Sequence, residues 1–374
     1  MEKIKMRINE VLLPAAEGAA IAGVLKLSEL INAKGKFKYS YDHKTGERKP
    51  EYNLLRHYGS LWSILTTMNK FELQAFAGIH FNKILTALQW VQNKYVKTQH
   101  DLPPSDNAWK FVVWQGHIKL GANGLALLAI SQMLRQLIKW RYRSDIAIKF
   151  GDQTEWIQHA EQLAIGIHKL RRDDGFVHKA VFSTMQPTDF VSEYYVGEAI
   201  FALGHWRTTC ELLNSHMSLD TTAFASYQAF YLIMQSLQQL AMINYGVEFQ
   251  SHWILYALSQ EICKNSFSGT LTSYMDAIVD DILDRPHYRS RKQSTPIACR
   301  TEGLLAAMQA YKYLEICGER QERMQQHIDV NIMQQLQWVK GDGAIIHGNK
   351  SNEVRIDMIQ HNISAFTNYT RFGN

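Results

Sequence analysis

The sequence predicts an all-α protein built from helical hairpins. Twelve segments repeat apolar residues at spacings of three and four, the period of an α-helix, as in Leu125, Leu128 and Ile130. Long alternating patterns typical of β-strands are missing, so strands are expected only in three short glycine-containing hairpins. The helices also alternate in character, because one member of each pair starts with polar and small residues and the other is a conventional amphipathic helix. This alternation predicts an inner ring of parallel helices with their N-termini at one end.

The expected helices follow one another along the whole chain. They lie near residues 15–33, 53–69, 71–96, 119–139, 154–171, 192–208, 221–243, 247–264, 272–284, 297–316, 320–339 and 354–369. Small residues recur inside several of them, as in Gly121–Gly124 and Arg300–Gly303. Since small residues lower helix propensity, their recurrence indicates close approach of neighbouring helices.

A short hairpin followed by a helix with polar first turns occurs three times. The three copies are 34–41 leading into 52–59, 173–179 leading into 192–198, and 341–347 leading into 354–361. In the first copy, Lys44–Glu47 has the residues of a tight turn. Equivalent positions of repeated units come to line one surface when the units stack or close into a ring. The polar residues at these positions therefore predict a pocket.

Composition favours a single domain over 1–374, with residues 1–30 as a helical segment packed on it. The chain is 46 % hydrophobic, has only 7 prolines and contains no Ser/Gly-rich linker. The net charge of +5 is mild and the basic residues are scattered, which argues against a nucleic-acid partner. The four cysteines have no CxxC spacing, so we expect buried free thiols in a reducing compartment and no metal site.

The N-terminal apolar stretch, Val11–Leu25, is interrupted by Pro14 and Glu17 and has no clean cleavage site. We expect a helix packed on the body rather than a signal peptide. It falls short of the ~18 continuous apolar residues of a membrane span. The expected location is the cytoplasm, or outside the cell by a route that the sequence does not show, and the oligomeric state stays open.

Several of these segments together resemble the (α/α)6 toroid of six-hairpin carbohydrate-active enzymes. The resemblance rests on Tyr52–Gly59, Asp173–Phe176, Glu193–Glu198, Arg300–Gly303 and Arg355–His361, and extends from about residue 30 to the end. Glycoside hydrolases, N-acylglucosamine 2-epimerases and glucuronyl C5-epimerases have this architecture. The resemblance is architectural, so it implies a saccharide substrate and transfers no catalytic assignment.

Two carboxylates open the second hairpin–helix unit. Glu193 and Glu198 lie about 140° apart around a helix, so only one of them is expected to point into the pocket. Glu193 stands at the first turn, beside Tyr194, where the helix dipole favours a carboxylate. A plain helix-start charge is the alternative interpretation of Glu193.

The third unit and the first unit supply the next candidates. Asp357 and His361 are four residues apart and share a helix face, so the carboxylate can orient the imidazole as a general base, or the pair can be structural. Arg56 has the planar guanidinium that binds a substrate carboxylate or phosphate. We expect Asn53, His57 and Arg355 at the same end of the ring.

Turn and rim residues complete the candidates. Asp173–Gly175 is most simply a turn, but Asp174 can be the second carboxyl of a hydrolytic pair, whose separation would decide retention or inversion. Aromatic residues near the expected rim can pack on sugar rings, although aromatic residues at helical spacing are more often core residues. They are Tyr39, Tyr41, Tyr58, Trp62, Tyr194, Tyr195, Trp253 and Tyr256. The basic segment 284–292 is either a solvated loop or a flap that guides an acidic glycan.

The resulting hypothesis is a carbohydrate-active enzyme using acid–base chemistry on an acidic or N-acetylated saccharide, without a cofactor. In a hydrolase, Glu193 or Asp174 is the acid, Asp357 activates water, and Arg56 and Arg300 hold the substrate. In an epimerase or lyase, His57, His361 and Tyr194 move a proton at a sugar carbon. A non-catalytic toroid that binds a protein or glycan is the third alternative. The other residues expected in the concavity are Asn53, Lys119, Glu302 and Arg355.

Motifs of other enzyme classes are missing from the sequence. It has no Walker loop, dinucleotide fingerprint, HExxH or GxSxG. Kinase, nicotinamide oxidoreductase, zincin and serine-hydrolase functions therefore have no support.

Overall fold

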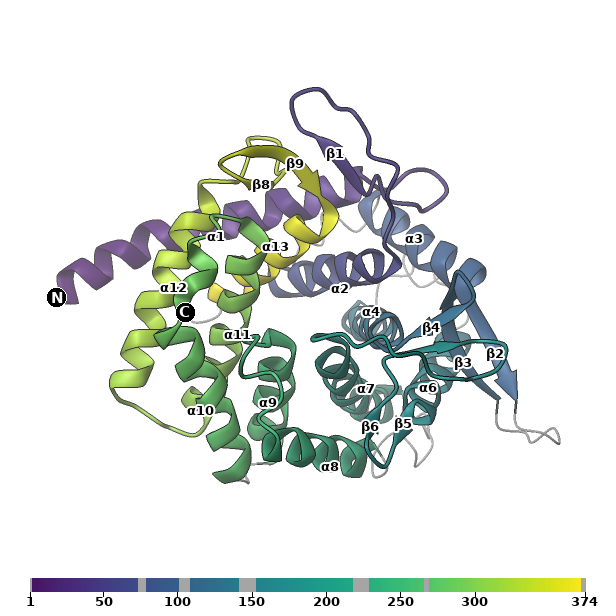
Figure 1. Ribbon diagram of the computed structural model, residues 1–374. Helices are drawn as coiled ribbons and strands as arrows, with labels where there is room; N and C mark the ends of the chain where they lie inside the picture. Colours follow the sequence, from purple (N-terminus) through teal and green to yellow (C-terminus); the bar gives the residue numbers. More distant parts are fainter. Residues whose placement is uncertain are drawn as a thin grey trace.

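The computed structural model describes residues 2–72, 79–100, 108–140, 153–217, 229–265 and 269–370, which contain twelve α-helices (Figure 1). Six helices form an inner ring: α2 (Leu54–Lys70), α4 (Leu120–Lys139), α7 (Tyr195–Met217), α9 (His252–Asn265), α11 (Ser294–Tyr313) and α13 (Ile356–Tyr369). Each contacts the next, and α13 closes the ring against α2.

Each inner helix is preceded along the chain by an outer helix. The outer helices are α1 (Glu2–Glu29), α3 (Ile79–Tyr95), α6 (Gln153–Lys169), α8 (Ala229–Met242), α10 (Gly269–Asp284) and α12 (Glu319–Leu336). The six outer–inner pairs form the (α/α)6 toroid, which confirms the predicted fold class.

Glycines allow the inner helices to approach closely. A Cβ atom on Gly124 of α4 would lie 2.9 Å from the backbone of Glu198 on α7. A Cβ atom on Gly197 would lie 2.7 Å from the Cβ of Trp253 on α9. Both distances are too short for a side chain, so the small residues of these helices are required by the ring, as the sequence indicated.

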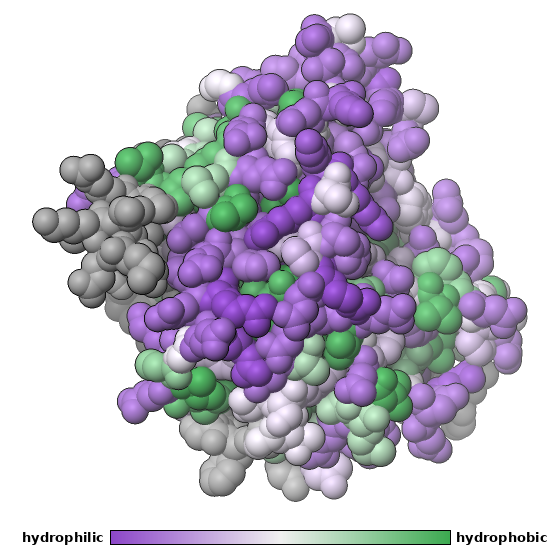
Figure 2. All heavy atoms as spheres, turned by 60° about the vertical axis from the view of Figure 1, so that its left-hand side comes forward, coloured by the Kyte–Doolittle hydropathy of each residue, from purple (hydrophilic) through white to green (hydrophobic). Residues whose placement is uncertain are grey.

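The outer helices turn a polar face to the solvent and an apolar face to the core. On α12, Met324, Ile328 and Ile332 are buried and the charged residues of its first turn face outward. The face of the molecule in Figure 2 is accordingly mostly hydrophilic, with hydrophobic residues in small separate groups.

Several short strands lie in the segments that lead into the N-terminal ends of the inner helices. Strand β1 (Ser40–Asp42) pairs with β9 (Ser351–Arg355), which also pairs with β8 (Ile346–Gly348). Strands β5 (Arg171–Arg172) and β6 (Gly175–Phe176) form the second predicted hairpin. The β1–β9 pairing ties the first repeated unit to the third, so α2 and α13 begin side by side.

The expectation that strands occur only in three hairpins was wrong. Strands β2 (Val96–His100), β3 (Ala108–Trp114), β4 (His117–Lys119) and β7 (Lys179–Val181) form a four-stranded antiparallel sheet in the order β2-β3-β4-β7. Between β3 and β4, Gln115 and Gly116 have φ of 51° and 73°, the left-handed conformation of a tight two-residue hairpin turn.

Helix α1 lies against α13, α12 and α2. A Cβ atom on its Gly23 would lie 2.3 Å from Cγ2 of Ile363 on α13, so the two helices are in close contact. The segment Glu10–Glu29 is long and apolar enough to cross a membrane by length and composition, and 44 % of its apolar window is buried inside the protein. Its packing agrees with the expected helix lying on the body.

Candidate active site

A cavity of about 450 Å³ opens at the N-terminal ends of the inner helices, and we call it the first cavity. Its lining comes from α2, α7, α9, α11 and α13, and from the segments that enter α7, α9 and α11. The lining residues are Arg56, Glu193, Tyr194, Glu198, Glu248, Phe249, His252, Trp253, His287, Tyr288, Arg291, Thr295, Pro296, Cys299, Arg300 and His361. Ionisable groups thus dominate its wall.

Arg56 projects into the first cavity from the first turn of α2. Asn53 caps that helix, since its side chain accepts hydrogen bonds from the backbone N–H groups of Leu55 and Arg56. The Nε of Arg56 lies 3.6 Å from the buried carboxylate of Asp357, which also accepts two hydrogen bonds from Arg355. Burial by itself would raise the pKa of Asp357, but Arg56 and Arg355 outweigh it and lower that pKa to about 2. Asp357 is therefore an ionised anchor for two arginines.

His361, on α13, is held by a buried carboxylate. Its Nδ1 lies 2.8 Å from Oε1 of Glu302 on α11, and Tyr256 donates a hydrogen bond to Oε2 of the same carboxylate at 2.9 Å. Because Nδ1 faces Glu302, Nε2 is turned to the other side, where Nη1 of Arg56 lies 3.4 Å away. Burial opposes the charged imidazole, but Cys299 and Glu302 raise the pKa of His361 above its ordinary value.

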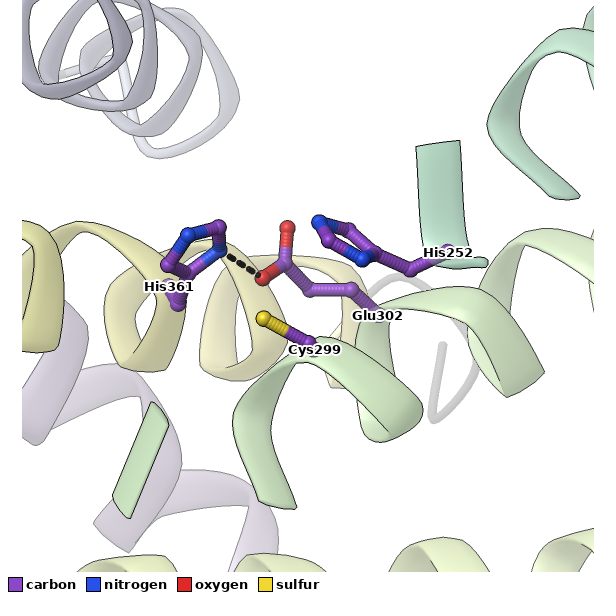
Figure 3. A group of neighbouring side chains, drawn as sticks. All are labelled: His252, Cys299, Glu302 and His361. Carbon is purple, nitrogen blue, oxygen red and sulfur yellow. Dashed lines mark hydrogen bonds and ion pairs between the residues drawn. The ribbon is translucent and has the colours of Figure 1, made fainter. Parts of the chain in front are cut away.

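A second histidine, His252 of α9, points into the same group (Figure 3). Its ring centroid lies 5.3 Å from that of His361, with the two rings nearly perpendicular. Neither ring nitrogen of His252 has a hydrogen-bond partner among the described residues, although the side chain is only 2 % exposed. Burial, together with His361, Arg300 and Arg56, holds the pKa of His252 well below its ordinary value. The site therefore contains a neutral imidazole beside a more basic one.

Glu198 is the buried carboxyl of the first cavity. It projects from the first turn of α7 into space that Gly121 of α4 leaves open, since a Cβ atom there would lie 2.0 Å from Oε2 of Glu198. Oε2 has no hydrogen-bond partner within the described ranges. Burial raises the pKa of Glu198 to about 7, against the opposite effects of Arg56 and His361. Near neutral pH this carboxyl can therefore give or take a proton.

The rim of the first cavity is more exposed. Glu193 and Tyr194 lie just before α7, so Glu193 and Glu198 both line the cavity, and the expectation that only one would do so was wrong. The guanidinium of Arg300 donates to Oε1 of Gln250 and to the backbone carbonyl of Phe249. Part of the basic segment 284–292 folds into the short helix η3 (Pro286–Arg289) and contributes lining residues.

Seven predicted site residues lie outside the lining of the first cavity: Asn53, His57, Lys119, Asp174, Glu302, Arg355 and Asp357. His57 is buried among aromatic rings, with Nδ1 facing the hydroxyl of Tyr52 and Nε2 facing the carbonyl of Ala87, and burial lowers its pKa to about 3. Asn53 is the helix cap described above. Lys119 precedes α4 and lies over the ring of Trp114. Asp174 is exposed in the β5–β6 turn.

Of the other candidates, Arg56, Glu193, Tyr194, Arg300 and His361 line the cavity. Glu302, Arg355 and Asp357 stand behind it, in contact with those lining residues or with one another. Their catalytic and binding roles stay predictions.

The sequence reasoning did not select His252, Cys299 or Glu198 as site residues. His252 begins an inner helix, and Cys299 stands one helical turn before Glu302. His252 could have been predicted from the sequence, because it lies in a polar first turn of the kind that identified the three repeated units. Cys299 carries no such pattern, because a cysteine in an apolar helix is an ordinary core residue.

The donor atoms of His252, Cys299, Glu302 and His361 all lie within 4.8 Å of one another, and these are atom types that bind transition metals. However, both oxygens of Glu302 already accept hydrogen bonds or ion-pair with protein groups. Glu302 is therefore already engaged by Tyr256 and His361, and the expected absence of a metal stays a prediction.

No protein-family model matches the sequence, and the search of curated proteins returns no match. Solved structures do match. The cellobiose 2-epimerase of Spirochaeta thermophila gives a TM-score of 0.56 at 12 % identity, over 96 % of this chain and 96 % of that one. The cellobiose 2-epimerase of Bacillus thermoamylovorans gives 0.60 at 10 % identity, over 92 % of this chain and 95 % of that one. At these identities the likeness shows the (α/α)6 fold.

Proposed function

We propose that the protein is a sugar epimerase that moves a proton at the carbon beside a saccharide carbonyl. The observation that supports this best is the pair formed by His252 and His361. Proton transfer at carbon needs a base that is free of its proton and an acid that holds one, close to the same substrate atoms. His252 has a lowered pKa and His361 a raised one, and their rings are 5.3 Å apart.

In the proposed reaction, His252 takes the proton from the carbon next to the carbonyl of the open-chain sugar. The C–H electron pair moves into a C=C bond and the carbonyl π electrons move to oxygen, which gives an enolate. His361 then donates its proton to the opposite face of the carbon as the C=C electrons return to that carbon and the carbonyl re-forms, which gives the epimer. His252 is left protonated and His361 neutral, and exchange with solvent restores both. Arg56 is placed to stabilise the negative charge that develops on oxygen.

The lining of the first cavity also supports an enzyme over a non-catalytic binding toroid. Perturbed ionisable groups gathered in a cavity are markers of catalysis. The guanidiniums of Arg56, Arg291 and Arg300 in the wall agree with an acidic or N-acetylated sugar, which keeps the expected substrate class.

The test is incubation with neutral, N-acetylated and uronic reducing sugars in D₂O, followed by NMR. We expect deuterium at the carbon beside the carbonyl, together with the epimeric sugar and no new reducing ends. Turnover without solvent deuterium at carbon would reject the epimerase.

A glycoside hydrolase is the second candidate, and Glu198 is the observation that favours it. A carboxyl with a pKa of about 7 is still protonated in a large fraction of the molecules near neutral pH and can protonate a leaving oxygen. Release of reducing ends from oligosaccharides without deuterium exchange would support this reaction, and an unsaturated sugar product would support a lyase.

A further inference from the structure

The inner ring encloses a second cavity, of about 420 Å³. All six inner helices line it, and it reaches Asn69, Lys264 and Asn368 close to the C-terminal ends of α2, α9 and α13. The first cavity lies at the N-terminal ends, so the two open toward opposite ends of the ring. A volume in this range accommodates a small molecule.

An aromatic layer forms one wall of the second cavity. Phe201 and Tyr256 are stacked with centroids 5.0 Å apart, and Trp62 stands edge-on to both at 5.9 and 6.0 Å. Trp253, which lines the first cavity, packs against Trp62 on the other side of this layer. The layer separates the cavities and offers apolar faces of the kind that pack on the C–H face of a ring.

One helical turn beyond the aromatic residues on α2, α7 and α9, polar groups of the second cavity have no hydrogen-bond partner among the described residues. His205 is only 7 % exposed, and its Nδ1 has no hydrogen-bond partner in the part of the chain that the structure describes. The same holds for Nε2 of Gln260 and Oγ1 of Thr66. An unpaired buried polar atom costs about 1–3 kcal/mol, so these three atoms favour an occupant that supplies donors and acceptors.

The lining amides suit hydroxyl groups. Gln132 and Gln260 each carry an acceptor and two donors, and Asn368 carries an acceptor and a second donor beside the hydrogen bond that its Nδ2 gives to the Tyr256 hydroxyl. These groups match a hydroxyl that both gives and takes a hydrogen bond. The cations do not call for an anion, since Lys264 pairs with Glu211 and Arg135 donates to Oγ1 of Thr209. Both also stand near helix C-termini, whose carbonyls favour positive charge.

We propose that the second cavity is a binding site for a neutral saccharide of one or two sugar units, separate from the acid–base cluster. The site has an aromatic wall on which a sugar ring can pack and amides that can hydrogen-bond to its hydroxyl groups. Its unpaired buried polar atoms can form further hydrogen bonds with those hydroxyl groups. This proposal does not depend on which reaction the first cavity catalyses.

Two cysteines allow each cavity to be followed separately. Cys263 lines the second cavity and Cys299 lines the first. Burial raises the pKa of Cys263, so alkylation by iodoacetamide is carried out at mildly alkaline pH in a Cys317→Ser variant that lacks the exposed thiol. Peptide mapping by mass spectrometry reads both sites in one sample.

The probes are glucose, mannose, N-acetylglucosamine and cellobiose at saturating concentration. We expect at least one of them to slow alkylation of Cys263 about tenfold, the result of about 90 % occupancy. In a Gln132→Ala/Gln260→Ala double variant this protection should be lost, while Cys299 responds as before. Equal alkylation of Cys263 with and without every probe would overturn the proposal, as would protection that survives in the double variant.

Titration calorimetry gives a second measurement if the Cys263 thiol fails to react. A saccharide that also binds the first cavity should show two sites in the wild type and one in the double variant. A saccharide that binds only the second cavity should give no heat of binding with the double variant. The same binding isotherm in both proteins would overturn the proposal.

Discussion

The Nδ1 atom of His361 lies 2.8 Å from Oε1 of Glu302, and both side chains are buried. This contact joins two inner helices that are 59 residues apart at these positions. The carboxylate fixes which ring nitrogen faces away from it, so Nε2 is the atom that remains for chemistry. Glu302 thereby acts as a positioning residue for the proposed acid.

The first prediction concerns Glu302→Gln. Loss of the carboxylate removes a negative neighbour that raises the pKa of His361, so His361 should lose its proton at lower pH. We expect the alkaline limb of the kcat–pH profile to move down by about one unit or more, with little change in KM. Glu322→Gln, at an exposed position of α12, is the control. An unchanged profile would argue against the positioning role.

The second prediction concerns His252→Asn. Removal of the proposed base should reduce epimerisation and deuterium exchange by about 10²–10⁴-fold, the usual contribution of general base catalysis. His117→Asn, in β4 outside the cavity lining, should keep full activity. Circular dichroism and the melting temperature of each variant show that the fold is retained. Substantial exchange in His252→Asn would assign the base to another group.

The third prediction uses the raised pKa of Glu198, which is about 7 against an ordinary 4.5. An acid with a raised folded pKa destabilises the protein when ionised, so the penalty is absent below pH 4.5, grows between 4.5 and 7, and is complete above 7. Glu198→Gln removes that penalty. It should raise the free energy of unfolding by up to about 3 kcal/mol at pH 8 and by little at pH 4.5.

Urea unfolding at the two pH values checks this prediction. Glu193→Gln, at the exposed rim, is the matched control and should change stability little at either pH. A gain for Glu198→Gln that is the same at both pH values would mean that ionisation is not its cause.

The fourth prediction compares two glycine substitutions. In Gly121→Ala the new Cβ would lie 2.0 Å from Oε2 of Glu198 and 2.4 Å from the ring of Tyr195, so the carboxyl must move. We expect a loss of about 1–3 kcal/mol in stability, as for overpacked cores, and a loss of activity. Gly18→Ala, in α1, meets nothing within 4 Å and should stabilise the protein slightly. Thermal melts and deuterium exchange measure both effects, and a Gly121→Ala variant as active as the wild type would show that Glu198 need not occupy its present place.

The fold was predictable because its determinants are local. Apolar residues at helical spacing, such as Leu125, Leu128 and Ile130, identify the buried face of a helix within a single segment. Twelve such segments account for most of the chain. The β2-β3-β4-β7 sheet was missed because its pairs are set by neighbours in space, although the Gln115-Gly116 turn was a local sign of one hairpin.

From the sequence alone, polar first turns predicted that the N-terminal ends of α2, α7, α11 and α13 face one cavity, and Arg56, Glu193, Tyr194 and Arg300 are among its lining residues. The N-terminal end of α9, with His252, was missed. Only the tertiary structure decided the chemistry inside it. The presence of both Glu193 and Glu198 in the cavity wall, the burial of His57 away from the cavity, and the meeting of His252 with His361 depend on rotations of separate helices about their axes. Those rotations follow from contacts between distant segments, such as Gly121 against Glu198, and burial there sets each pKa.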